Sequence, residues 1–489
     1  MKLKYLTKLI KPFYITATQV LLCLVLTFPS QKTICQSFTQ ELTLEEELTE
    51  MGNKFVELLN ASSEETALEL GNQVFKESSA NEWTLEFRKD YGSVESGRIR
   101  LTIGSEYQTV HVIVKVKKLN VWRNFQLVFD NALPKRSGRV NIVLAARPVT
   151  ISPGLITEPR VQTELKAYID ELDAEGALSG SLLITKDQKP LIERVFGIAN
   201  REKNRPVTAE TPFNLASGGK MFTAVATLRL VKAGKLNLND PLNKFLPAYP
   251  DQALAKRVTV AHLLSHTSGL GDYWDDAFEQ HWDEIKQHAD YVPFIAKQPL
   301  LSEKTGEGVY SNSNFILLGL IIEEVAGQDY YSHIEETIFK PLAMTHTGFY
   351  GKGDEDIIAV GYLDLGGGNA IRSRVGGRGS SAGGVYSTTR DMLKFRNAVL
   401  NYKLLSKEML TLATSEQALL DGGMAYGYGF SLYDSFSGSF GHGGRGPGSA
   451  STFDIDESSG LTFITMSSMV NGAYSELLFT LKEVLRREK

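Results

Sequence analysis

Ser217 and Lys220, three residues apart, form the pair best suited to chemistry in this sequence. The serine stands just before an apolar pattern of helical spacing that ends at Gly234. Residues three apart lie on one face of a helix, so the lysine amine can reach the serine hydroxyl. A serine becomes a strong nucleophile when a partly desolvated lysine accepts its proton, and a helix N-terminus stabilises a nearby oxyanion. The pair therefore predicts acyl-transfer chemistry.

The spacing alone is a weak signal, because an N-cap serine followed by a solvated lysine gives the same pattern. A second motif accompanies it, since Tyr310-Ser311-Asn312 is the only Tyr-x-Asn in the chain. In an extended loop, residues two apart point the same way, so the phenol and the amide can face one cleft. We expect Tyr310 to shuttle a proton if a Lys220 cation holds its pKa down, and Asn312 to hydrogen-bond a substrate. The alternative is a turn whose tyrosine packs on the core.

A third motif, Gly441-His442-Gly443-Gly444, is followed by Arg445. Glycines would let a strand edge approach a substrate closely, and His442 would supply a polar group at the cleft. A glycine-rich turn with a surface histidine is the alternative. The segment is not a phosphate loop, because it lacks the Lys-Ser/Thr ending and contains Pro447.

Two folded regions must position these motifs. Residues 36–147 are predicted to form a small α+β domain. Apolar residues at helical spacing predict one helix over 42–60 and a second that begins at a capping box of Ser62 and Glu65. Strands are expected near 98–103, 109–116 and 121–129. The segment 148–159 reads as a linker, and residues 160–489 as the domain that carries the motifs. There we expect a helix over 160–174, paired strands near 182–185 and 191–195, a helix-rich middle, late strands near 453–456 and 461–466, and a terminal helix. Strands at both ends of a helical middle predict one antiparallel sheet flanked by helices.

The N-terminus has the pattern of an export signal. Lysines 2, 4, 8 and 11 precede an apolar stretch over residues 20–28, and a cleavage site is expected after Cys35. The apolar run is too short for a membrane anchor, although a lipid-anchored Cys35 is a second possibility. Both cysteines, Cys23 and Cys35, lie in this segment, so the mature chain would contain neither a disulfide nor a cysteine-ligated zinc site. Its removal takes away five lysines and changes the net charge from −5 to −10, which argues against nucleic acid as a partner.

The order Ser-x-x-Lys, Tyr-x-Asn and His-x-Gly resembles the penicillin-recognising serine hydrolases of the class C β-lactamase type, a group that includes esterases, D-aminopeptidases and D,D-peptidases. The resemblance covers about residues 160–489 and extends to the stretches 234–241, 263–270 and 382–388. The N-terminal region resembles the nuclear-transport-factor-like domains, although no motif defines that likeness.

The resemblance implies specific roles. Ser217 would be acylated, with Lys220 and Tyr310 managing protons. The residues Asn312, His442, Gly443, Gly444 and Arg445 would form the substrate site. The backbone N–H groups of Ser217 and Arg445 would make the oxyanion hole. No metal or cofactor is implied. We expect His266 and Ser268 to shape a buried turn, His281 and His288 to lie on the surface of a helix, and His111 to be a sheet residue and not a ligand.

One departure from the group's pattern affects the expected substrate. His442 stands where classical β-lactamases have a lysine, and a histidine is largely neutral at pH 7. The leading hypothesis is therefore an exported hydrolase, periplasmic or secreted, that cleaves a small ester or amide, including D-amino-acid peptides. The alternatives are a true β-lactamase or D,D-carboxypeptidase, and a non-catalytic binding protein on the same fold. The sequence leaves the natural substrate and the oligomeric state open.

Overall fold

The computed structural model describes residues 31–486, apart from 104–107, 119–120, 130–135, 146, 149–150, 352, 364–370, 374–376, 421–422 and 435–438. The basic and apolar parts of the expected signal lie outside these residues, so its removal stays a prediction. Among the described residues, no helix is long and apolar enough to cross a membrane. The chain divides into two compact units, the second of which contains 104–106, 113–125 and 142–489.

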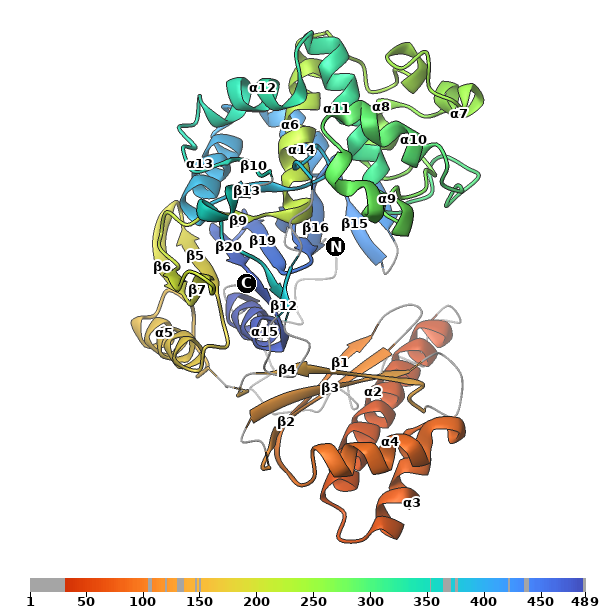
Figure 1. Ribbon diagram of the computed structural model, residues 1–489, viewed down its shortest axis with the longest axis vertical. Coiled ribbons are helices and arrows are strands. Elements are labelled where there is room, and N and C mark those ends of the chain that lie inside the picture. Colours follow the sequence, from red (N-terminus) through yellow and green to blue (C-terminus); the bar gives the residue numbers. More distant parts are fainter. Residues whose placement is uncertain are drawn as a thin grey trace, which may run out of the picture. The chain divides into compact units, whose positions relative to one another are not determined.

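The N-terminal region contains three helices followed by a four-stranded sheet of order β1-β2-β3-β4 (Figure 1). The bounds are α2 Gln31–Asn60, α3 Glu64–Val74, α4 Glu77–Asp90, β1 Val94–Ile103, β2 Gln108–Val116, β3 Val121–Phe129 and β4 Arg139–Leu144. The sequence did not predict α4 or β4, and the predicted capping box is wrong by one residue. Ser63, not Ser62, caps α3, and its hydroxyl accepts a hydrogen bond from the Thr66 N–H. His111 lies within β2, as expected.

The second unit is built on an antiparallel sheet of order β14-β15-β16-β17-β19-β20-β5-β6, with β18 paired to β19. The bounds are β5 Gly180–Lys186, β6 Lys189–Phe196, β14 Ala418–Leu420, β15 Met424–Tyr426, β16 Ser431–Asp434, β17 Ser439–Gly441, β18 Gly444–Gly446, β19 Ser449–Asp456 and β20 Leu461–Ser467. Seven registered pairs join β20 to β5, so strands from the two ends of this unit lie side by side in the sheet. This arrangement confirms the predicted antiparallel sheet.

Helices cover both faces of this sheet (Figure 1). On β5, Leu182 and Ile184 face one core, which contains helices α5 and α15, whereas Leu183 faces the other. Successive strand residues point to opposite faces, so a strand such as β20, in which every residue is buried, is covered on both sides. The helical bounds are α5 Pro159–Ala174, α6 Lys220–Lys232, α7 Gln252–Arg257, α8 Val260–Leu264, α9 Asp276–His281, α10 Val292–Ile295, α11 Asn312–Ala326, α12 Tyr330–Ile334, α13 Thr389–Leu400, α14 Lys407–Ala413 and α15 Gly472–Arg486.

Short strand pairs occur among the helices and at the sheet's ends. One pair joins β7 Ile198–Asn200 and β8 Arg205–Pro206. A three-stranded sheet has β13 Val385–Ser387 between β9 Phe213–Asn214 and β10 Gly348–Phe349. Another has β11 Tyr362–Leu363 between β12 Ile371–Arg372 and β21 Met469–Val470. The pairing of β9 with β13 thus places the segment before Ser217 beside residues about 170 positions later in the chain.

Helix α6 is the centre of the larger core. The sequence pattern predicted an amphipathic helix, but residues 220–228 and Leu230 are all buried. Helices α11 and α12 pack on α6, and its side chains share one core with residues of the sheet. The helix ends as expected at Gly234, whose φ of +70° is readily adopted by glycine. Phe222 is fully buried and makes edge contacts with Phe339 and Phe395, at centroid distances of 5.0 and 4.7 Å.

We expect Phe222→Ala to lower the free energy of unfolding by about 3–5 kcal/mol, because it removes a ring from a site that cannot collapse around the cavity. Urea denaturation followed by circular dichroism would measure the change. Leu419→Ala is the control, since Leu419 is 59% exposed and its loss should cost under about 0.5 kcal/mol. Equal effects of the two substitutions would contradict this account of the core.

Candidate active site

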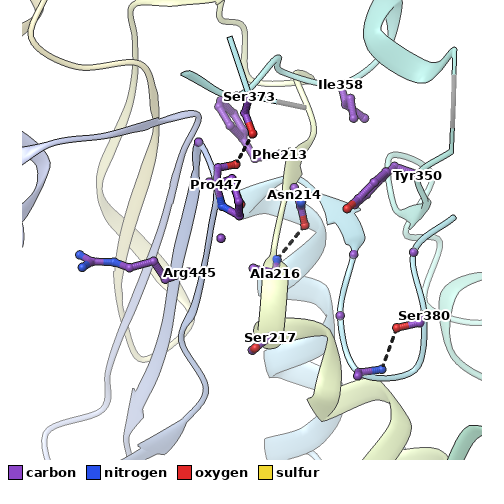
Figure 2. A pocket seen from close by; sticks show the side chains of 18 of the residues that line it. Phe213, Asn214, Ala216, Ser217, Tyr350, Ile358, Ser373, Ser380, Arg445 and Pro447 are labelled. Carbon is purple, nitrogen blue, oxygen red and sulfur yellow. Dashed lines mark hydrogen bonds between the residues drawn. The ribbon is translucent and has the colours of Figure 1, made fainter. Parts of the chain in front are cut away.

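Ser217 lies in a one-turn 3₁₀ helix, Ala216–Gly219, that leads directly into α6. Ala216 has a φ of +47°, which is unfavourable for a residue with a Cβ, so the surrounding contacts must hold the turn. The Ala216 N–H donates to Asn214 Oδ1 at 2.8 Å, and the Leu215 N–H donates to the Val385 carbonyl at 2.8 Å. Figure 2 shows Ser217 at the tip of this turn, facing a pocket.

The Lys220 amine lies 3.2 Å from Ser217 Oγ, as the three-residue spacing predicted. It also contacts two carbonyl oxygens, Asn312 Oδ1 at 2.7 Å and the Ala382 backbone oxygen at 2.6 Å. Burial lowers the pKa of Lys220 to about 7, and the charge of Asp272 only partly opposes this effect. In the neutral amine, the two N–H groups satisfy the two carbonyls, so the lone pair is left for the Ser217 hydroxyl. This geometry fits a general base.

Tyr310 is hydrogen-bonded to Ser217, and the Lys220 amine lies 5.0 Å from the centre of its ring. The condition that a Lys220 cation holds the pKa of Tyr310 down is not met. Burial raises the pKa of Tyr310, and the hydrogen bond with Ser217 only partly opposes that rise. The phenol therefore keeps its proton at neutral pH and can act as a donor. His266, in its buried turn, stacks on this ring at a centroid distance of 4.2 Å.

Asn312 is the first residue of α11 and is fixed by contacts on both sides of its amide. Its oxygen accepts from Lys220, and its nitrogen donates to Asp272 Oδ2 at 2.8 Å. The backbone N–H of Asn312 donates to the same carboxylate oxygen at 3.0 Å. Asp272, which the sequence analysis did not single out, therefore orients Asn312 toward the lysine. No spacing in the sequence relates these two residues, because they are 40 positions apart.

His442 is buried and does not reach the cleft, contrary to expectation. Its Nδ1 bonds to the Gly443 carbonyl and its Nε2 lies 3.0 Å from the Tyr426 hydroxyl, so the ring is Nδ1-protonated and accepts from the phenol. Burial, together with the Lys220 charge, lowers the pKa of His442 to about 3. His442 therefore supplies no positive charge to a substrate, and it orders the strand that follows it.

Gly444 explains why the third motif contains glycine. A Cβ on this residue would lie 1.9 Å from the Leu215 oxygen and 2.8 Å from the Ser217 nitrogen, so the strand β18 packs directly on the nucleophile turn. Because alternate residues of a strand face opposite ways, Arg445 points away from Ser217 (Figure 2). The arginine thus does not replace the missing lysine. Gly443, by contrast, has only the Ser451 oxygen within 3.4 Å of a built Cβ.

A pocket of about 340 Å³ opens beside Ser217. Its lining includes Asn312 and the loop 379–384, together with aromatic side chains from several segments of the chain. Aromatic residues in the lining are Phe213, Tyr273, Trp274, Trp282, Tyr291 and Tyr350. Within the described part of the chain, no group of three or more His, Cys, Asp or Glu side chains is arranged to hold a metal ion.

Comparison with known proteins gives the family. Residues 165–483 match the β-lactamase family, which is well over half of the chain. This chain belongs to the β-lactamase family. It is a serine hydrolase with the α+β fold of that family, so the predicted resemblance and fold class are confirmed.

Individual relatives differ in what their names describe. The chain is 31% identical over 294 residues to penicillin-binding protein 4* of Bacillus subtilis, and 28% identical over 264 residues to a teichoic acid D-alanine hydrolase of Staphylococcus aureus. The matches cover 55% and 54% of this chain and 63% and 64% of those proteins, just under two thirds of their length. The structure of a D-amino acid amidase from Ochrobactrum anthropi, complexed with L-phenylalanine amide, is 25% identical, with a TM-score of 0.54 over 67% of this chain and 97% of the amidase.

The prediction that His288 lies on the surface of a helix is wrong, whereas His281 is exposed as expected. His288 is fully buried, because tyrosines pack around its ring. Its Nε2 accepts the Ser381 N–H at 3.0 Å, and its Nδ1 lies 3.0 Å from Glu323 Oε1. Ser381 precedes Ala382, whose oxygen holds the Lys220 amine, so the histidine fixes the loop that orients the base.

The pKa of Lys220 predicts the pH dependence of this β-lactamase-family enzyme. The base must be neutral, so kcat/KM should rise about tenfold per pH unit below pH 7 and level off above it. Hydrolysis of a chromogenic ester between pH 5 and 9 would measure the profile. Lys220→Arg should lose nearly all activity, because a guanidinium stays protonated over this range. A flat profile from pH 5.5 to 8.5 would contradict the role of Lys220 as the base.

Replacing His288 should impair turnover without touching the substrate. We expect His288→Phe to lower kcat roughly 10- to 100-fold, because the 381–382 loop loses its anchor and the base its alignment. Steady-state kinetics would test this, with thermal melting to confirm that the variant is folded. His281→Phe is the matched control and should behave as the unmodified enzyme. A folded His288→Phe variant with unchanged kcat would show that the loop holds its position unaided.

Proposed function

We propose that this enzyme cleaves a small ester or amide through an acyl-Ser217 intermediate. The observation that carries the proposal is the buried Lys220 amine, which has a pKa of about 7 and lies 3.2 Å from Ser217 Oγ beside an open pocket. Hydrolysis is also named among the relatives, in the teichoic acid D-alanine hydrolase and the D-amino acid amidase.

The proposed reaction has two steps. Lys220 takes the proton of Ser217 as its oxygen attacks the substrate carbonyl, and the N–H groups of Ser217 and Arg445 stabilise the oxyanion. Protonated Tyr310, hydrogen-bonded to Ser217, donates a proton to the leaving group and is reprotonated through Lys220. Water then attacks the acyl-enzyme by the same route, which releases the acid and restores the serine.

Hydrolysis of β-lactam antibiotics or of D,D-peptides is the less favoured function. Those substrates carry a carboxylate, and a lysine in the third motif would bind it next to the nucleophile. Here the position is held by His442, which is neutral and buried, and Arg445 points to the other side of the strand. The non-catalytic alternative is set aside because the chain is a serine hydrolase.

We also propose that the protein is exported after removal of residues 1–35. The basic and apolar pattern of the N-terminus supports this proposal. N-terminal sequencing of the protein recovered from its native envelope or medium would test it, and a chain that still begins at Met1 would contradict it.

Substitution of the nucleophile tests the function directly. Ser217→Ala should reduce release of p-nitrophenol from p-nitrophenyl butyrate on the order of 10⁶-fold, because the whole mechanism passes through the serine oxygen. Intact-protein mass spectrometry after rapid quenching should show a mass increase of one butyryl group on the unmodified chain and none on the variant. Equal rates for the two proteins would overturn the assignment of Ser217. Hydrolysis of nitrocefin at a comparable kcat/KM would favour the β-lactamase function instead.

A further inference from the structure

The pocket beside Ser217 has an unbalanced charge. Among the described residues that line it, there is no aspartate or glutamate, and the charged side chains are Arg378 and Arg445. Because Arg445 points away from the nucleophile (Figure 2), Arg378 is the other cation among these lining residues. It stands directly before Gly379, whose N–H donates to the Tyr350 carbonyl at 2.8 Å.

Arg378 is positioned by an aromatic ring, and its N–H donors have no acceptor among the described residues. Its guanidinium carbon lies 3.4 Å from the centre of the Tyr331 ring, a stacking distance. A planar guanidinium stacked on a ring keeps its N–H groups in the plane, where they can meet a carboxylate or another anion edge-on. In the part of the chain that the structure describes, Arg378 makes no hydrogen bond and no ion pair within 4 Å.

Nearby carboxylates do not neutralise this arginine by direct contact. The pKa of Asp329 is lowered first by a hydrogen bond with the Ser332 hydroxyl, and only in smaller part by the charge of Arg378. Asp283 and Asp354 line a separate hollow that Arg378 also borders. Neither of them forms a recorded ion pair with Arg378 among the described residues.

Asp272, the acid that orients Asn312, is not part of the pocket lining and is already hydrogen-bonded. Asp272 accepts two hydrogen bonds from Asn312 at Oδ2 and one from the Trp274 N–H at Oδ1, at 3.1 Å. A substrate with a free ammonium group would thus meet no unused carboxylate in the pocket. A substrate with an anionic group would meet the guanidinium of Arg378, which is stacked on Tyr331.

We propose that Arg378 is a specificity residue that binds an anionic group, such as a carboxylate, on the substrate. The inference rests on the proposed function, since it concerns which esters or amides acylate Ser217. The stacked guanidinium donates to the anion, and the aromatic side chains bind the apolar part that links the anion to the reacting carbonyl. The preferred substrate is therefore an ester or amide that carries a carboxylate or another anionic group, and not one with a free amino group.

Matched pairs of esters test the proposal. In the acyl pair, 4-nitrophenyl hydrogen adipate is compared with its neutral methyl ester. In the leaving-group pair, 3-carboxyphenyl butyrate is compared with its methyl ester. The ratio of kcat/KM, anionic over neutral, is measured for the unmodified enzyme, Arg378→Gln and Arg378→Lys. Arg390→Gln is the charge-matched control, because Arg390 pairs with Glu193 and does not line the pocket.

We expect the unmodified enzyme to prefer the anionic member of at least one pair. In that pair the ratio should fall roughly three- to tenfold in Arg378→Gln, and less in Arg378→Lys. It should also fall in 0.5 M NaCl, because Arg378 is exposed and its charge is screened. The Arg390→Gln ratio should match that of the unmodified enzyme.

Two outcomes would overturn the proposal: ratios in both pairs that do not change in Arg378→Gln, or an equal fall in Arg390→Gln, which would indicate only a loss of overall positive charge. Failure of the proposed function looks different. In that case the neutral esters themselves would be hydrolysed no faster than by Ser217→Ala, whatever the ratios are.

Discussion

The burial of one amine organises this active site. Lys220 has no exposed surface, and its nitrogen is surrounded by two carbonyl oxygens and one hydroxyl. Burial disfavours the ammonium form, which brings the pKa of Lys220 to about 7 and makes a neutral base available at ordinary pH. The carbonyls then decide where the lone pair points. The reactivity of the serine depends on this combination of burial and fixed acceptors.

Three separate parts of the chain maintain that environment. Helix α6 supplies the lysine, the start of α11 supplies the Asn312 oxygen, and the loop before β13 supplies the Ala382 oxygen. Each acceptor is oriented by a further hydrogen bond: Asp272 for Asn312, and His288 with Glu323 for the loop. Such supporting contacts are needed because a general base must be held within a fraction of an ångström of its proton.

Two different segments border the nucleophile and carry the arginine that we propose to bind the substrate's anionic group. Near the nucleophile, β18 approaches so closely that Gly444 has no room for a side chain, and the preceding histidine is buried and neutral. Of the two arginines among the described lining residues, Arg378 belongs instead to the 377–384 segment and stacks on Tyr331. In this arrangement the third motif shapes the nucleophile turn, and charge recognition belongs to a different loop.

The sequence alone determined the family, the sheet with its helical covering, and the group Ser217, Lys220, Tyr310 and Asn312, because these rest on local spacing and on periodicities that the backbone imposes. It did not determine what depends on long-range contact. Burial raises the pKa of Tyr310, and no nearby cation lowers it. His442 was expected at the cleft and His288 on the surface of a helix, but both lie in the interior. The direction of Arg445 followed from strand pairing, and the positions of Asp272 and Arg378 from loops folding back on the pocket. Electrostatics follow burial and distance in three dimensions, and neither quantity is encoded in the spacing of residues along the chain.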